Sequence, residues 1–133
     1  MLVDTSAYSA LAMADEQVIE VLSSAKTIVL PLPALAEIKF GNMLGLRTAE
    51  NNKKLQNFLS QPQVQVAYPD VETAEIYAEL ATYSRRLGRS VGNNDLWIAA
   101  LAKQFDERLI TYDRDFEVFK DVLNCGVAVL STS

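Results

Sequence analysis

The chain has 133 residues, of which 50% are hydrophobic and 22% charged, and its formal net charge is −5. This length predicts one domain over residues 1–133 with a hydrophobic core of its own. The absence of histidine excludes Ser-His-Asp and Cys-His catalysis and His-ligated zinc, while the acidic charge argues against a nucleic-acid binder that depends on a basic face.

Short apolar runs alternate with segments of helical periodicity along the whole sequence. The predicted strands cover residues 1–3, 27–31, 64–68, 108–111 and 126–130. The predicted helices cover 7–14, 16–24, 33–44 and 48–59, then a long one capped by Asp70 and ended by Gly88, one that starts near Asp95, and a short one over 113–119. This alternation predicts an α/β fold with a parallel sheet and right-handed crossovers.

Four carboxylates stand at or just past apolar runs: Asp4, Glu37, Asp95 and Asp113. In a parallel sheet, residues just beyond the carboxyl ends of the strands converge on one crevice. A pocket of carboxylates without histidine is what a hard divalent cation such as Mg²⁺ prefers. These positions therefore predict metal-dependent chemistry on phosphate.

We expect Asp4, Asp95 and Asp113 to bind the metal directly or through water, and Glu37 to hold a second cation or orient the attacking water. A purely structural role competes for the three aspartates, because each stands at a predicted helix start, where Asp is favoured as a cap. Glu37 has no such explanation. It interrupts the apolar face of its helix, where burial without a partner would be costly.

Polar neighbours accompany these acids. Thr5, Ser6 and Thr111 offer hydroxyls that could bind the waters of a metal or a phosphate, or simply cap helices. Asn93 and Asn94 are expected to be loop and capping residues, with substrate contact as the alternative role. The basic candidates for holding substrate phosphates are Lys39, Arg47, Arg85, Arg86, Arg89 and Arg114.

The remaining signals concern location. The single cysteine, Cys125, rules out an internal disulfide, and its apolar neighbours predict a buried strand position. The N-terminus lacks the basic region of a signal peptide, and no apolar run approaches the roughly 20 residues of a transmembrane helix. We expect a cytoplasmic protein with no membrane partner.

Four segments carry a family resemblance: MLVDTS (1–6), PALAEI (33–38), VGNNDLWIAA (91–100) and LITYDRDF (109–116). In this order and spacing they resemble the PIN-domain ribonucleases, specifically the VapC toxins of bacterial toxin–antitoxin pairs. The resemblance implies a PIN-like three-layer α/β/α domain with a central parallel sheet of four to five strands. It also implies an Mg²⁺- or Mn²⁺-dependent endoribonuclease that cleaves structured RNA, such as tRNA or rRNA, and so stops translation.

The resemblance further implies a homodimer, inhibited by a cognate VapB-type antitoxin that occupies the acidic pocket. Asp4, Glu37, Asp95 and Asp113 match the acidic positions of the family. Asp115 matches an additional acid in the closing motif.

One departure from the family pattern stands beside Asp4. Family members often have Asn after the Asp-Thr pair, where this chain has Ser6. Because serine can still cap a helix and bond locally, the departure changes the expected surroundings of Asp4 without excluding activity.

Two alternatives stay open. A phosphoacceptor receiver domain also has an acidic magnesium pocket in a doubly wound sheet, but it needs a Lys near the end of a late strand, and Thr111 is followed by Tyr112. The other alternative is a PIN-like module that binds RNA or a protein partner without cutting.

Overall fold

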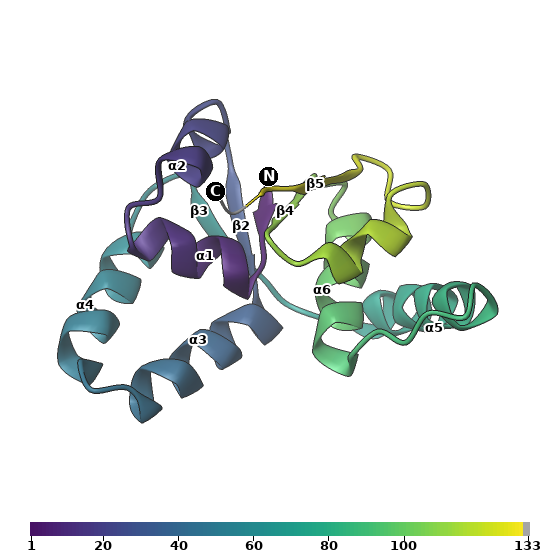
Figure 1. Cartoon of the computed structure of the whole chain (residues 1–133), viewed down its shortest axis with the longest axis horizontal. Helices are drawn as coiled ribbons and strands as arrows, with labels where there is room; N and C mark the ends of the chain where they lie inside the picture. Colours follow the sequence, from purple (N-terminus) through teal and green to yellow (C-terminus); the bar gives the residue numbers. More distant parts are fainter. Residues whose placement is uncertain (132–133) are drawn as a thin grey trace.

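A computed structural model describes residues 1–131, so the last two residues of the expected domain, 132 and 133, lie outside the described part. Five parallel strands form one sheet in the order β3-β2-β1-β4-β5 (Figure 1). The strands are β1 (Leu2–Val3), β2 (Ile28–Pro31), β3 (Val64–Ala67), β4 (Leu109–Thr111) and β5 (Val127–Val129). The predicted parallel sheet is confirmed, with five strands.

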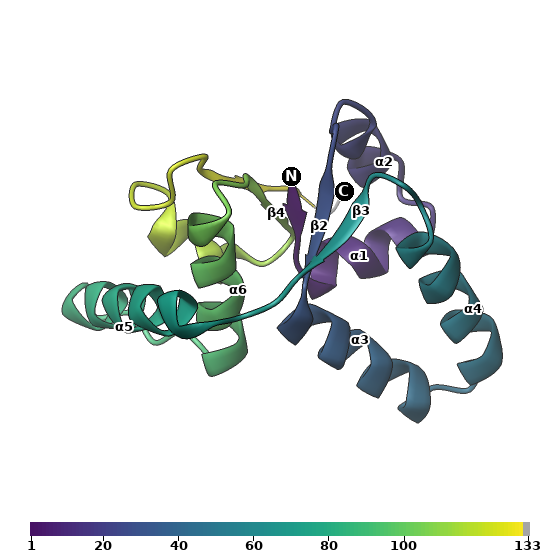
Figure 2. The ribbon, with the colours of Figure 1, turned by 180° about the vertical axis from the view of Figure 1, so that it is seen from behind.

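Helices cover both faces of this sheet. They are α1 (Thr5–Ala12), α2 (Glu16–Ser23), α3 (Leu32–Leu44), α4 (Thr48–Leu59), α5 (Val71–Arg86), α6 (Asn93–Gln104) and the 3₁₀ helix η1 (Arg114–Phe119). In both views α1–α4 lie on one side of the strands, and α5, α6 and η1 lie on the other (Figures 1 and 2). The chain changes face where it returns from β3 at one edge of the sheet to β4 beside β1, as right-handed crossovers require.

The centre of the sheet is the centre of the core. Leu2 and Val3 are fully buried, and Leu2 pairs with Val29 on one side and Leu109 on the other. Strands covered on both faces are expected to be continuous apolar runs, as these are. The connection after β1 leads to β2 on one side of the sheet, and the connection after β4 leads to β5 on the other side. The crevice for a ligand therefore lies beyond the carboxyl ends of β1 and β4.

The strand order also decides between two of the folds considered for the sequence. A receiver domain has a doubly wound sheet in the order 2-1-3-4-5, whereas this sheet has the order 3-2-1-4-5. The receiver alternative is therefore wrong.

Several helix boundaries differ from the prediction by one or two residues. The first helix ends at Ala12 rather than at residue 14, because Ala14 adopts a left-handed backbone with φ of 59°. Helix α6 begins at Asn93 with Gly92 as its N-cap, so Asn93 and Asn94 belong to the helix and not to a loop. Helix α6 thus starts two residues before Asp95, the start that the apolar pattern predicts.

The long helix is capped as predicted. The Asp70 side chain accepts the Thr73 N–H, and the Thr73 hydroxyl accepts the Asp70 N–H, which together form a capping box. Thr73 and Leu80 lie on the buried face of α5, whereas Val71 and Ala74 are exposed.

The predicted buried strand position of Cys125 is wrong. Strand β5 starts two residues later, at Val127, after a turn in which Gly126 has φ of 77°. Cys125 lies exposed in this turn, with its Sγ 3.0 Å from the carbonyl oxygen of Asp106. Among the described residues, no helix is both long and apolar enough to span a bilayer.

Candidate metal centre

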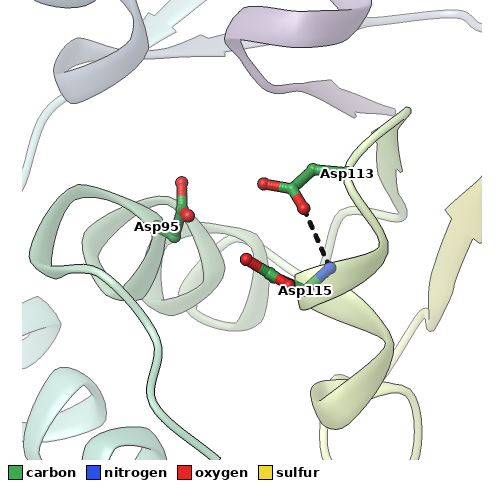
Figure 3. Close-up of side chains that lie close together, drawn as sticks. All are labelled: Asp95, Asp113 and Asp115. Carbon is green, nitrogen blue, oxygen red and sulfur yellow. Dashed lines mark hydrogen bonds between the residues drawn. The ribbon is translucent and has the colours of Figure 1, made fainter.

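Three aspartates converge just beyond the carboxyl edge of the sheet: Asp95, Asp113 and Asp115 (Figure 3). Asp95 lies in the first turn of α6, whereas Asp113 and Asp115 lie at the start of η1, directly after β4. One carboxylate oxygen from each residue lies within 4.8 Å of those of the other two. Figure 3 shows the three side chains around a common space between α6 and the start of η1.

A local hydrogen bond fixes the two acids that follow β4. The Asp113 side chain caps η1 by accepting the N–H of Asp115 at 2.9 Å. The N–H of Asp113 donates to the Thr111 hydroxyl at 2.8 Å. The cap expected at this helix start is present, and it also brings Asp115 close to Asp113.

Asp4 is a buried carboxylate behind this group and is only 4% exposed. Its Oδ1 accepts the Ala7 N–H at 2.8 Å, which caps α1, and its Oδ2 accepts the Thr111 hydroxyl at 2.6 Å. Burial raises the pKa of Asp4, while the hydrogen bonds from Thr111, Ala7 and Ser6 oppose that rise and the nearby charge of Asp113 adds to it.

Ser6 completes the surroundings of Asp4. Its hydroxyl lies 2.8 and 3.0 Å from the two carboxylate oxygens of Asp4, to which it donates, and it accepts the Tyr112 N–H at 3.0 Å. Ser6 therefore links the end of β1 to the chain that leaves β4. The serine at the usual Asn position therefore forms hydrogen bonds with both Asp4 and Tyr112.

Thr5 differs from the other two hydroxyl residues named by the sequence. Its hydroxyl oxygen is buried and has no hydrogen-bond partner among residues 1–131. Thr111 and Ser6, by contrast, both bond to the acid at the end of β1.

The electrostatics of the group are those of crowded like charges. Burial and, after it, the negative charges of Asp113, Glu37, Asp4 and Asp115 together raise the pKa of Asp95 from its usual 3.8 to about 6. All the donors are oxygens, which suit Mg²⁺ or Mn²⁺. A divalent cation would relieve the repulsion that the raised pKa reflects, so the residues present fit such an ion.

Glu37 lies in the second turn of α3 and is partly buried. The partner that its burial requires is Asn94, whose Nδ2 donates to Glu37 Oε1 at 2.8 Å. Since Asn94 directly precedes Asp95, this bond ties α3 to the turn of α6 that carries a candidate metal ligand.

The structure thus divides the five acids named by the sequence. It brings Asp113 and Asp95 together with Asp115, which the family resemblance names only as an additional acid. Asp4 and Glu37 flank the group and act on Asp95 through their charge, but they are not among the three whose oxygens lie within 4.8 Å of one another. The hydrogen bond between Asn94 and Glu37 was missed, because nothing in the sequence indicates a contact between residues 57 positions apart.

Comparison with known proteins identifies the family of this chain. The family model described as the PIN domain matches residues 1–122. The chain is 30% identical to the Ribonuclease VapC2 of Rickettsia felis over 106 residues, which are 80% of this chain and 76% of that protein. It is 33% identical to the Ribonuclease VapC5 of Mycobacterium tuberculosis over 82 residues, which are 62% and 61% of the two chains.

Solved structures agree over almost the full length. A chain of the VapBC2 structure from Rickettsia felis, bound to a DNA fragment from the promoter, is similar with a TM-score of 0.82 and 25% identity, over 98% of both chains. A chain of FitAcB from Neisseria gonorrhoeae is similar with a TM-score of 0.76 and 27% identity, over 95% of this chain and 94% of that one. The chain therefore belongs to the PIN-domain family and, within it, to the VapC ribonuclease toxins of toxin–antitoxin systems.

Proposed function

We propose that this protein is an Mg²⁺-dependent endoribonuclease that cleaves structured RNA, either tRNA or rRNA, in the cytoplasm, with Mn²⁺ as a possible substitute. The observation that carries the proposal is the convergence of Asp95, Asp113 and Asp115 at the carboxyl edge of a PIN-type sheet. The reaction would be hydrolysis of a phosphodiester bond by an activated water. The VapC relatives named as ribonucleases support this class of reaction.

The residues at the site would have two roles, cation binding and positioning. Asp95, Asp113 and Asp115 would hold the cation through carboxylate oxygens. When bound, a divalent cation lowers the pKa of water and offsets the negative charge that develops on the phosphate. Thr111 would act as a positioning residue, because its hydroxyl contacts both Asp4 and the backbone of Asp113.

Asp4 and Glu37 would support the cation-binding group in different ways. Asp4 is held by donors to both of its oxygens, so it would fix the end of β1 and add negative charge behind the ligands. Glu37 is partly exposed and is oriented by Asn94. It is therefore our candidate for orienting the attacking water.

The proposal includes two protein partners, a cognate VapB-type antitoxin and a second copy of this chain. The VapBC2 structure of the Rickettsia relative supports an antitoxin. Four apolar side chains at the end of α3 also support a protein partner, since each is more than 60% exposed and clustered exposed apolar groups mark interaction surfaces. They are Phe40, Met43, Leu44 and Leu46.

Inducible expression in a bacterial host, followed by mapping of RNA 5′ ends, tests the proposed function. We expect growth arrest together with new 5′ ends at one or a few positions of tRNA or rRNA. The Asp95→Asn variant, expressed at the same level, should produce neither. Growth arrest without new RNA ends would contradict the proposal and favour a module that binds without cutting.

A further inference from the structure

A second pocket, separate from the acidic group, lies between the end of α5 and the start of α6. It has a volume of about 340 Å³, which is at the small end of the range for ligand sites. Both charged residues of its lining are arginines, Arg85 and Arg89, and both are exposed. The polar residues of the lining are Tyr77, Thr82, Ser84, Ser90 and Asn93. No Asp or Glu is among the described residues that line it.

The backbone that carries the two arginines is fixed by the way α5 ends. Gly88 adopts φ of 70°, which a residue with a side chain would resist. The Gly88 N–H donates to the Arg85 carbonyl and the Arg89 N–H donates to the Ser84 carbonyl, both at 2.9 Å. This pair of bonds is a Schellman motif, and it turns the chain so that Arg89 lines the same pocket as Arg85.

Two other lining residues, Tyr77 on α5 and Asn93 on α6, are also held in place. The Tyr77 hydroxyl donates to Asn93 Oδ1 at 3.0 Å, and the Tyr77 ring packs on Trp97 with ring centroids 4.7 Å apart. Because Asn93 Oδ1 is the acceptor in this bond, its Nδ2 remains as a donor beside the arginines.

The two guanidinium groups have no carboxylate partner in the part of the chain that the structure describes. The ion pair found there joins the N-terminal ammonium of Met1 to Glu107. Basic residues in the last turn of a helix offset its dipole, but that role belongs equally to Arg86, which lines a different, mostly apolar hollow on α5. Stabilisation of the helix end therefore does not explain why Arg85 and Arg89 share one pocket.

The pocket and the candidate metal centre lie on different sides of the first turn of α6, because side chains two residues apart on a helix do not face each other. Asn93, in the pocket, and Asp95, in the acidic group, are two residues apart in the first turn of α6, which is about 3 Å along the helix axis. A polyanion that approaches an acidic site in a chain of net charge −5 needs cationic contacts close by. Arginine is the side chain best suited to bind phosphate with two parallel hydrogen bonds.

We propose that Arg85 and Arg89, with Asn93, bind one backbone phosphate of the RNA where the strand passes the start of α6, on the side of this turn away from the acidic group. This assignment rests on the proposed ribonuclease function, because it supplies the substrate-positioning contact that the acidic group lacks. Phosphate contacts of this kind set register and orientation rather than sequence preference.

Binding of fluorescently labelled unfractionated tRNA to the full chain, measured in EDTA so that no cleavage occurs, tests this subsite. Arg85→Gln and Arg89→Gln should each weaken binding about tenfold. The double variant should lower the slope of log affinity against log salt by about 0.7–0.9, the value for one phosphate. Arg86→Gln, which removes the same charge one residue away, should change affinity less than about twofold.

The outcomes separate the subsite from the ribonuclease function. If the wild type cleaves tRNA with Mg²⁺ while the double variant binds tRNA as the wild type does, the subsite is wrong and the function stands. If the wild type cleaves nothing but the double variant still loses tRNA affinity relative to Arg86→Gln, the subsite stands and the function is wrong. Equal losses in all three variants would indicate non-specific attraction and overturn the subsite.

Inorganic phosphate, tested alone, separates an RNA phosphate from a free one. It should displace labelled tRNA from the wild type only at concentrations far above those of unlabelled tRNA. Displacement at comparable concentrations would assign the pocket to free phosphate and overturn the RNA assignment.

Discussion

The Thr111 hydroxyl donates a 2.6 Å hydrogen bond to the buried carboxylate of Asp4, across 107 positions of sequence. The same oxygen accepts the N–H of Asp113 at 2.8 Å. Thr111 is fully buried and Asp4 is nearly so, whereas Asp113 is partly exposed. One hydroxyl thus connects the ends of β1 and β4 and couples a buried acid to a candidate metal ligand.

Removing this hydroxyl should destabilise the protein. Thr111→Val keeps the shape of the side chain but leaves the Asp4 carboxylate without its shortest donor, so we expect a loss of about 1–3 kcal/mol in the free energy of unfolding. Urea denaturation measures this loss. Thr111→Ser, which retains the hydroxyl, should lose less than about 1 kcal/mol. Wild-type stability in Thr111→Val would show that the hydrogen bond does not stabilise the protein.

The stability of the metal-free protein should depend on pH through Asp95. Its pKa is raised from 3.8 to about 6, so the folded state binds this proton more tightly than the unfolded chain. The contribution to stability is therefore fully present below about pH 4 and is lost as pH rises through about 6. Asp95→Asn should remove this dependence and raise the unfolding free energy near neutral pH by about 1–2 kcal/mol.

Denaturation in EDTA on both sides of this pH window, for the wild type and Asp95→Asn, provides the measurement. Asp121→Asn serves as the control, since it removes a carboxylate from an exposed turn outside the acidic group. If Asp95→Asn destabilises the metal-free protein near neutral pH, then the acids do not repel one another as described.

Asp115 should prove to be a metal ligand. Its carboxylate lies with those of Asp95 and Asp113, so Asp115→Asn should lower Mn²⁺ affinity about tenfold or more in calorimetric titration. Glu117→Gln, which removes an exposed acid two residues later in η1, should leave the affinity within about twofold. The same affinity in both variants would assign the cation to other acids.

The bond between Asn94 and Glu37 should matter for activity more than for stability. Asn94→Ala removes the donor that orients Glu37. Because the contact is exposed, we expect less than about 1 kcal/mol of lost stability, together with a loss of about tenfold in RNA cleavage rate, as is typical for a partner of a metal-site carboxylate. An unchanged cleavage rate would show that catalysis does not depend on the orientation that Asn94 gives to Glu37.

Much of the fold could be predicted because local signals agree with the tertiary arrangement. Apolar runs that stop at Asp4 and Asp113 mark the ends of β1 and β4, and the rule for parallel sheets then places both acids at one edge. The Asp70 cap could be read directly from the spacing of Asp70 and Thr73.

The rest depends on contacts that sequence patterns do not encode. Asp115 reaches the cation group because Asp113 accepts its N–H and starts a 3₁₀ helix, a tighter turn that the residues 113–119 do not distinguish from an α-helix. The partner of Glu37 comes from the packing of α3 against α6. The apolar neighbours of Cys125 predict strand, but the turn at Gly126 delays β5 and leaves the thiol exposed.

Cleavage of a defined RNA pool by purified, antitoxin-free protein tests the metal-dependent ribonuclease most directly. Wild-type protein should cut tRNA or rRNA with Mg²⁺ or Mn²⁺, stop when EDTA is added, and resume when the cation is restored in excess. Asp95→Asn, confirmed as folded, should show no cleavage above background. Cleavage that persists in EDTA, or that Asp95→Asn retains at the wild-type rate, would contradict the assignment of the acidic group as the metal centre.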